Sequence, residues 1–184
     1  AGQLGLGVEQ QLVPVDHLLR PEMKCLPAIA VVVHPDGLTH FVVVWRRRGR
    51  WLQLMDPAIG RRWVPVEAFV ASVYRHAMPV PAAAWREWAG TEGAQEAFRR
   101  RMSELGLGRA DAERWLATAN GDDTWRGLAT LDAGLRYIDR MVAAGALRAG
   151  REARASLAGL LAEGGAERIP DAWWSVRPIE GGGD

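Results

Sequence analysis

The chain of 184 residues is long enough for one domain or two small ones, and its 48% hydrophobic content is sufficient for a packed core. A formal net charge of +1 gives no reason to expect a nucleic-acid partner, and Lys24, the only lysine, does not stand in the Gly-Lys-Ser/Thr of an ATP-binding loop, so any ATPase module would belong to another part of a longer protein. The single cysteine excludes an intrachain disulfide and a thiolate zinc cluster, so we expect no metal or cofactor in this chain, and no apolar run approaches the roughly 18 residues of a membrane-spanning helix.

The first part of the chain is glycine-rich, and we predict a strand over about 8–15. Asp16 is placed to cap a short helical turn that Pro21 ends. Three histidines have no partner in the local sequence and are predicted to be solvent-facing: His17, His34 and His76.

Cys25 is the only thiol and is therefore weighed as a nucleophile. Catalytic thiols are activated at helix N-termini or beside a cation, whereas Cys25 comes directly before Leu26-Pro27, where the proline disfavours helix. We predict that Cys25 is a small half-buried residue and that it is not catalytic.

Three short apolar runs follow, at Ala28–Val33, His40–Trp45 and Trp51–Met55. They are rich in valine and are separated by Pro-Asp-Gly and Arg-Gly-Arg turns, which predicts an antiparallel meander. The arginine run at 46–50 falls at the tip of the second hairpin, where solvated charges are expected. Trp45 and Trp51 would form a cross-strand pair beside that turn.

Two polar residues interrupt this apolar pattern, His40 at the start of the second strand and Asp56 just past the third. A hairpin centred on Arg48-Gly49 places position 40 opposite position 57, and Pro57 would leave Asp56 in a loop that can turn toward the ring. A His beside a carboxylate is the base and its orienting group in a catalytic triad. A core His hydrogen-bonded to a carboxylate is the structural alternative, and the pair alone favours it.

Four pieces of sequence in a fixed order surround this pair. Together they resemble the double-glycine leader peptidase domain, a papain-like cysteine peptidase at the N-terminus of bacterial peptide-exporting ABC transporters. In that resemblance His40 matches the catalytic His and Asp56 matches the Asp that orients it. The matching pieces are Leu26-Pro27-Ala28-Ile29, His40-Phe41-Val42-Val43, Asp56-Pro57-Ala58-Ile59-Gly60 and Glu67-Ala68-Phe69.

The resemblance implies an α+β fold in which residues 1–81 form the antiparallel sheet of a truncated papain-like domain. The family's nucleophilic Cys, and a Gln that helps stabilise the oxyanion, precede the first matching piece, so we expect both to be missing from this chain. The resemblance further implies a leader-peptide substrate cut after a double glycine. It also implies partners in the membrane and ATPase domains of the same or a partner chain, at the cytoplasmic side of the bacterial inner membrane.

After Pro79-Val80-Pro81 the composition changes from Val-rich to Ala- and Leu-rich, so we place a domain boundary there with Ala82–Ala84 as a linker. Residues 82–168 have helical periodicity, which predicts a small antiparallel α-helical bundle. Four helices are predicted: one through Phe98, Met102 and Leu105 that ends at Gly106, one through Ala112–Ala119 that ends at Asn120-Gly121, one capped by Asp122 or Asp123 that reaches Val142, and one near Glu152–Ala162.

Residues 169–184 are predicted to be an extended aromatic tail and linker. Trp173 and Trp174 are adjacent, and they would either dock on a neighbouring domain or pack on the chain's own helices.

Three classes of function follow from these observations. The first is the His/Asp half of a leader peptidase within a peptide exporter. The second is an inactive peptidase-like domain that binds or docks the exported polypeptide. The third is an unrelated Arg-rich helical interaction module, which nucleic-acid binding with a steep salt dependence would distinguish.

Overall fold

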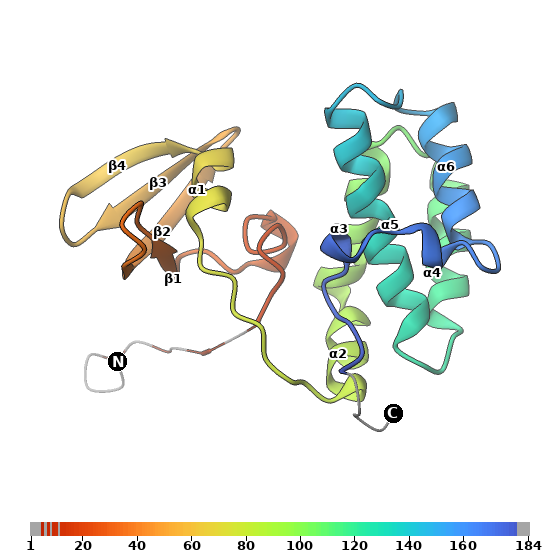
Figure 1. Cartoon of the computed structure of the whole chain (residues 1–184), viewed down its shortest axis with the longest axis horizontal. Helices are drawn as coiled ribbons and strands as arrows, with labels where there is room; N and C mark the ends of the chain where they lie inside the picture. The colour runs from red at the N-terminus through yellow and green to blue at the C-terminus, as the bar shows by residue number, and fades with distance from the viewer. Residues whose placement is uncertain (1–4, 6, 8, 11, 180–184) are drawn as a thin grey trace. The chain divides into compact units, whose positions relative to one another are not determined.

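The computed structural model describes residues 5, 7, 9–10 and 12–179. The described residues form four strands and six α-helices, and the chain divides into two compact units, Ala1–His76 and Ala77–Asp184. The first unit contains the sheet and one helix, and the second contains the other five helices (Figure 1). The predicted α+β class, an antiparallel sheet followed by packed helices, is confirmed.

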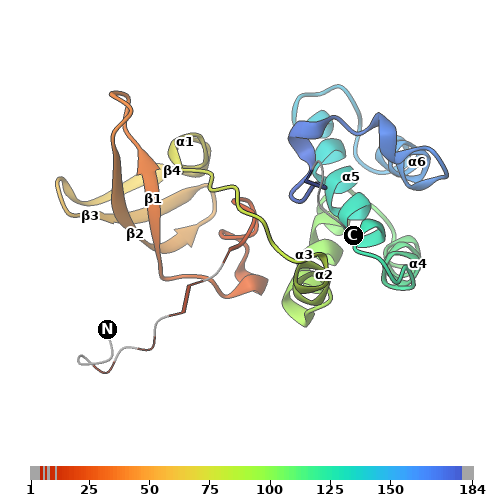
Figure 2. The same cartoon turned by 60° about the horizontal axis from the view of Figure 1, so that its bottom comes forward.

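The sheet is an antiparallel meander in which neighbours in sequence are neighbours in space (Figure 2). The first three strands lie where the apolar runs predict them. The fourth was not predicted, because Arg61-Arg62 interrupts its apolar pattern. The strands are β1 (Ala28–Val33), β2 (Thr39–Arg48), β3 (Trp51–Asp56) and β4 (Gly60–Pro65).

One face of the sheet is covered by helix α1 (Val66–Ser72), which contacts β1, β3 and β4. Alternate residues of each strand point toward α1, as the period of a strand requires. Phe69 is the residue that α1 buries most deeply. The buried core of this unit consists of Leu19, Ala30, Val32, Val42, Val44, Leu52, Leu54 and Phe69.

The segment before β1 differs from its prediction. Val8 and Gln11 lie outside the described residues, and the described residues from 9 to 14 are not in a strand. The predicted turn is present at residues 15–19, where the His17 and Leu18 N–H groups donate to the Pro14 carbonyl oxygen, and Pro21 then begins a separate 3₁₀ turn, Pro21–Met23. His17 was predicted to face solvent and is instead fully buried, close in sequence to Leu19, which joins the core. Histidine is intermediate among residue types in its tendency to be buried, and the local sequence around His17 carries no periodic signal that marks it as interior.

The second unit contains the helices α2 (Ala82–Ala89), α3 (Glu92–Glu104), α4 (Arg109–Asn120), α5 (Arg126–Ala143) and α6 (Arg151–Leu161). Four of them coincide with the predicted periodic segments, and the predicted stripes are their buried faces. Helix α2 was missed because Ala82–Ala84 was interpreted as a linker, whereas these alanines form its first turn. After α3, Gly106 takes a positive φ of 73°, a conformation that glycine adopts without strain.

A buried ion cluster ties the end of the chain to this unit. The Asp132 carboxylate accepts hydrogen bonds from Arg101 at 3.3 Å and from Arg136 at 3.0 Å, and Ser175 donates to it at 2.6 Å. The tail that begins at Ile169 was predicted to be extended. A 3₁₀ turn at Asp171–Trp173 interrupts it before the Ser175 contact. Both indoles of the tail, those of Trp173 and Trp174, pack against the helical core.

Candidate active site

His40 and Asp56 lie together on the face of the sheet that α1 covers. The His40 Nε2 atom is 3.3 Å from Asp56 Oδ2, and the Asp56 side chain is fully buried while 25% of the His40 side chain is exposed. Among the residues that the structure describes, none is hydrogen-bonded to the other ring nitrogen of His40, Nδ1. With the Nε2 proton donated to Asp56, Nδ1 carries the lone pair that can accept a proton.

A β-bulge in β2 decides that this pair shares a face. Arg48 pairs with Trp51 at the turn, whereas beyond the bulge Val44 pairs with Leu54, one residue away from the register that the turn alone would continue. Continued along the strands, the shifted register places Asp56 level with Val42, two residues from His40. Since a one-residue slip moves every side chain to the opposite face, an unbulged hairpin would have separated the carboxylate from the ring.

The predicted register, with position 40 opposite position 57, is therefore wrong by one residue. Asp56 is also not in a loop, because it ends β3 and pairs with Gly60 of β4. The side-chain contact that was expected is present, but the bulge at Trp45 produces it rather than a flexible loop after the strand. A bulge of one residue has no signature in the apolar pattern that predicted the hairpin.

Asp56 is held as an anion by several donors. Burial on its own would raise the pKa of Asp56, but hydrogen bonds from the Ala58 backbone N–H and from His40, together with the charges of His40 and Arg62, lower that pKa below its ordinary value. The Ala58 N–H donates to Oδ1 at 3.0 Å, and Arg62 Nη2 donates to Oδ2 at 3.0 Å. His40 and Arg62 therefore share one carboxylate oxygen, which fixes the position of the carboxylate from two sides.

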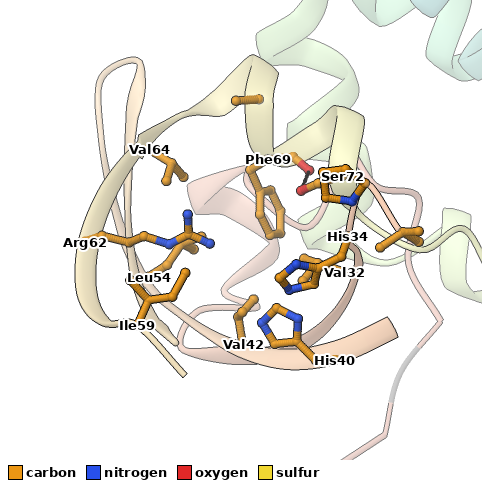
Figure 3. Close-up of a pocket in the computed structure, with 13 residues that line it drawn as sticks. Val32, His34, His40, Val42, Leu54, Ile59, Arg62, Val64, Phe69 and Ser72 are labelled. Atoms are coloured by element: carbon orange, nitrogen blue, oxygen red, sulfur yellow. Dashed lines mark hydrogen bonds between the residues drawn. The ribbon is translucent and has the colours of Figure 1, made fainter. Parts of the chain in front are cut away.

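His40 lines a pocket of 350 Å³ between the sheet and α1. Figure 3 shows the two imidazoles of His34 and His40 side by side at one end of the pocket and Arg62 across from them. The ring centroids of the two histidines are 4.2 Å apart. The remaining lining is mostly apolar and consists of Val32, Val33, Pro35, Val42, Leu54, Ile59, Val64, Ala68, Phe69 and Ser72. The pocket can therefore hold an apolar group beside the basic nitrogen of His40.

Comparison with known families supports what the geometry suggests. Residues 1–78 match the Peptidase C39 family. This part of the chain is a Peptidase C39 domain. The match confirms the resemblance drawn from the four sequence pieces around His40 and Asp56. No curated protein and no solved structure matches the chain.

Cys25, the only cysteine of the sequence, lies in the C39 domain but outside the lining of the His40 pocket. Cys25 Sγ lies 3.5 Å from the Met23 carbonyl oxygen, and burial raises the pKa of its thiol. Cys25 does not line the pocket that contains His40. A raised pKa leaves little thiolate near neutral pH, which is the opposite of what a nucleophilic cysteine requires.

Two residues of this candidate site were not singled out from the sequence. His34 was predicted to face solvent, yet it is half-buried against His40. Its position follows from the register of β1 and β2, because Val32 pairs with His40 and His34 lies two residues beyond Val32 on the same face. Arg62 carried no signal, because β4 was not recognised as a strand.

No group of three or more His, Cys, Asp or Glu side chains within the described ranges stands close enough to hold a metal ion. Within those same ranges, no helix combines the length and apolarity required to cross a bilayer. The site itself places the His40 imidazole beside the buried Asp56 carboxylate.

Proposed function

We propose that the C39 domain supplies the general base and its orienting carboxylate for a cysteine peptidase that cuts leader peptides after a double glycine. His40 is the base and Asp56 the orienting group. The observation that carries this proposal is the contact of His40 Nε2 with the buried, ionised Asp56, which leaves Nδ1 available on a partly exposed ring. The family of residues 1–78 supplies the class of reaction.

In the proposed reaction, His40 Nδ1 takes the proton of a cysteine thiol, and the thiolate attacks the carbonyl carbon of the scissile bond. The protonated ring then donates its Nδ1 proton to the departing amine, which leaves a thioester. A water molecule, deprotonated by the same nitrogen, hydrolyses the thioester and releases the free thiol. Asp56 stabilises the imidazolium during both steps, and the buried position of its carboxylate strengthens that effect.

The thiol in this proposal is not that of Cys25, whose pKa is raised by burial. Since Cys25 is the only cysteine of the 184 residues, the nucleophile would come from residues outside them. We place the enzyme within a peptide exporter, together with membrane and ATPase domains of the same or a partner chain.

A second function is favoured by the same cysteine. A C39 domain whose one thiol is half-buried and weakly acidic can bind or dock an exported polypeptide without cutting it. The two proposals differ in whether His40 matters for bond cleavage.

The test measures cleavage of a synthetic peptide that contains a double glycine. The enzyme is the polypeptide encoded by the native gene, including any residues encoded before Ala1, and its wild-type form is compared with single-residue variants. His40→Ala and Asp56→Asn are expected to lower kcat/KM by about 10²–10⁴-fold. His76→Ala is the matched control, because His76 is exposed in the same unit and lies outside the pocket. Unchanged cleavage by the His40 variant would refute the proposed role, and absence of cleavage by the native polypeptide would favour the docking function.

A further inference from the structure

The face of the sheet opposite α1, called the outer face below, is apolar and exposed. Strand register places its residues together, because Val31 pairs with Phe41, Val43 with Met55, and Gln53 with Trp63. Contiguous exposed apolar surface of this kind marks interaction sites in soluble domains. Its large apolar side chains, with exposed fractions from 37% to 70%, are Ile29, Val33, Phe41, Trp45, Trp51, Met55 and Trp63.

The charges on the outer face are all positive. Arg46, Arg48 and Arg61 share the face with these apolar residues, as their pairing with Gln53, Trp51 and Met55 requires. The four strands contain one acidic residue, Asp56, and it is buried on the α1 side. No strand carboxylate therefore neutralises the arginines of the outer face.

Two features of the outer face have a defined geometry: a stacked guanidinium and an open depression. The Arg46 guanidinium lies 5.6 Å from the Trp63 ring centroid, and its Nε donates at 2.9 Å to the side chain of Gln53, which is only 5% exposed. Beside it, Arg48, Trp51 and Trp63 line an open depression of 470 Å³. A guanidinium stacked on an indole is pre-organised for a carboxylate, and the depression offers a place for an apolar side chain.

We propose that the outer face docks an amphipathic helical segment that carries apolar side chains on one side and acidic side chains on the other. A second copy of this chain would bring the same arginines toward one another across a shared face, which like charges oppose. A lipid bilayer is a fluid partner that needs neither a fixed guanidinium nor an apolar depression. The acidic segment uses both features. This docking site lies on the opposite side of the sheet from His40 and does not depend on the proposed peptidase activity.

Fluorescence anisotropy of a labelled peptide with the full chain tests the proposal. The probe is a synthetic amphipathic helix of about 18 residues, five turns, with leucines on one side and glutamates on the other, and its partner has lysines in place of the glutamates. We expect the lysine peptide to bind about 10-fold more weakly, a difference that rising salt reduces.

Substitutions on the outer face separate its charges from its apolar surface. Arg48→Glu is expected to lower the affinity for the glutamate peptide by about 10-fold and to raise the affinity for the lysine peptide. Trp63→Ser is expected to lower the affinity for the glutamate peptide by about 30-fold. Arg109→Glu is the matched control with the same charge change, because Arg109 is exposed at the start of α4 in the other unit, and it should bind like the wild type.

Equal binding of the two peptides, or binding that Arg48→Glu leaves unchanged, would overturn the proposal. A dimer that Trp63→Ser dissociates would assign the outer face to a second copy, and tighter binding to phosphatidylglycerol vesicles or to an oligonucleotide than to the peptide would assign it to those partners. Peptide binding tests this proposal and cleavage by the His40 variant tests the peptidase proposal, so failure of one is distinguishable from failure of the other.

Discussion

Replacing Asp56 by Asn tests how strongly the buried carboxylate holds the site together. The substitution keeps an oxygen for the Ala58 N–H but removes the charge that attracts His40 and Arg62. Hydrogen bonds to charged groups are worth about 1.5–3 kcal/mol each, but His40 and Arg62 are 25% and 40% exposed, so solvent screens both contacts. We therefore expect Asp56→Asn to lower the free energy of unfolding of the first unit by about 2 kcal/mol at neutral pH.

The same variant should also change the pH dependence of stability. The pKa of Asp56 is lower in the folded chain than its ordinary value of about 3.9, so its contribution is present above that value and is lost as pH falls through the folded-state pKa. Asp56→Asn has no such group and should lose less stability between about pH 5 and pH 2 than the wild type does.

Amide hydrogen exchange in β3 is the appropriate assay, because the chain has two units that unfold separately in principle. A loss of about 2 kcal/mol lowers the protection of these amides by about 30-fold. Asp36→Asn, an exposed change in the β1–β2 turn, is the control and should leave β3 protection unchanged. Equal protection in Asp56→Asn and wild type at neutral pH, with the same decline in acid, would refute the electrostatic role given to Asp56.

Three further predictions concern other parts of the chain. Cys25 should react with a disulfide reagent more slowly than a free cysteine near pH 8, because burial raises the pKa of its thiol, and equal rates in the folded and urea-unfolded chain would contradict this. Asp132→Ala should lower the free energy of unfolding of the helical unit by about 3–5 kcal/mol in a urea titration, because it leaves buried arginines without their carboxylate, whereas the exposed Asp171→Ala should change it by less than about 0.5 kcal/mol. Gly106→Ala should cost about 1–3 kcal/mol in the same titration, since its φ is 73° and a Cβ there would meet the Gly150 nitrogen at 3.0 Å; wild-type stability would show that the turn relaxes.

The sequence predicted the sheet well where apolar runs and turn residues agreed. Val-rich runs bounded by Pro-Asp-Gly and Arg-Gly-Arg located three strands, and helical stripes located four of the five helices of the second unit. Both signals are local periodicities, which a single sequence displays directly. Where the period was broken, as by the paired arginines of β4 or the short alanine run of α2, the element was missed.

The site was predicted only in outline. His40 and Asp56 were identified as a pair, but the bulge that aligns them depends on packing across two strands and not on any local residue signal. Neither the contact of His34 nor that of Arg62 follows from sequence spacing alone, because each requires the register of a neighbouring strand. Burial of His17 was missed for a related reason, since only the tertiary fold decides which loop residues become interior.

The most direct test of the His40–Asp56 pair reads the protonation of the His40 ring itself. Nitrogen-detected NMR at a pH where the imidazole is neutral identifies which ring nitrogen carries the proton and how fast that proton exchanges with water. The proposed geometry predicts the proton on Nε2, with slow exchange in the wild type and fast exchange in Asp56→Ala. A proton on Nδ1, or an exchange rate that does not respond to Asp56→Ala, would contradict the assignment of His40 as a base oriented by Asp56.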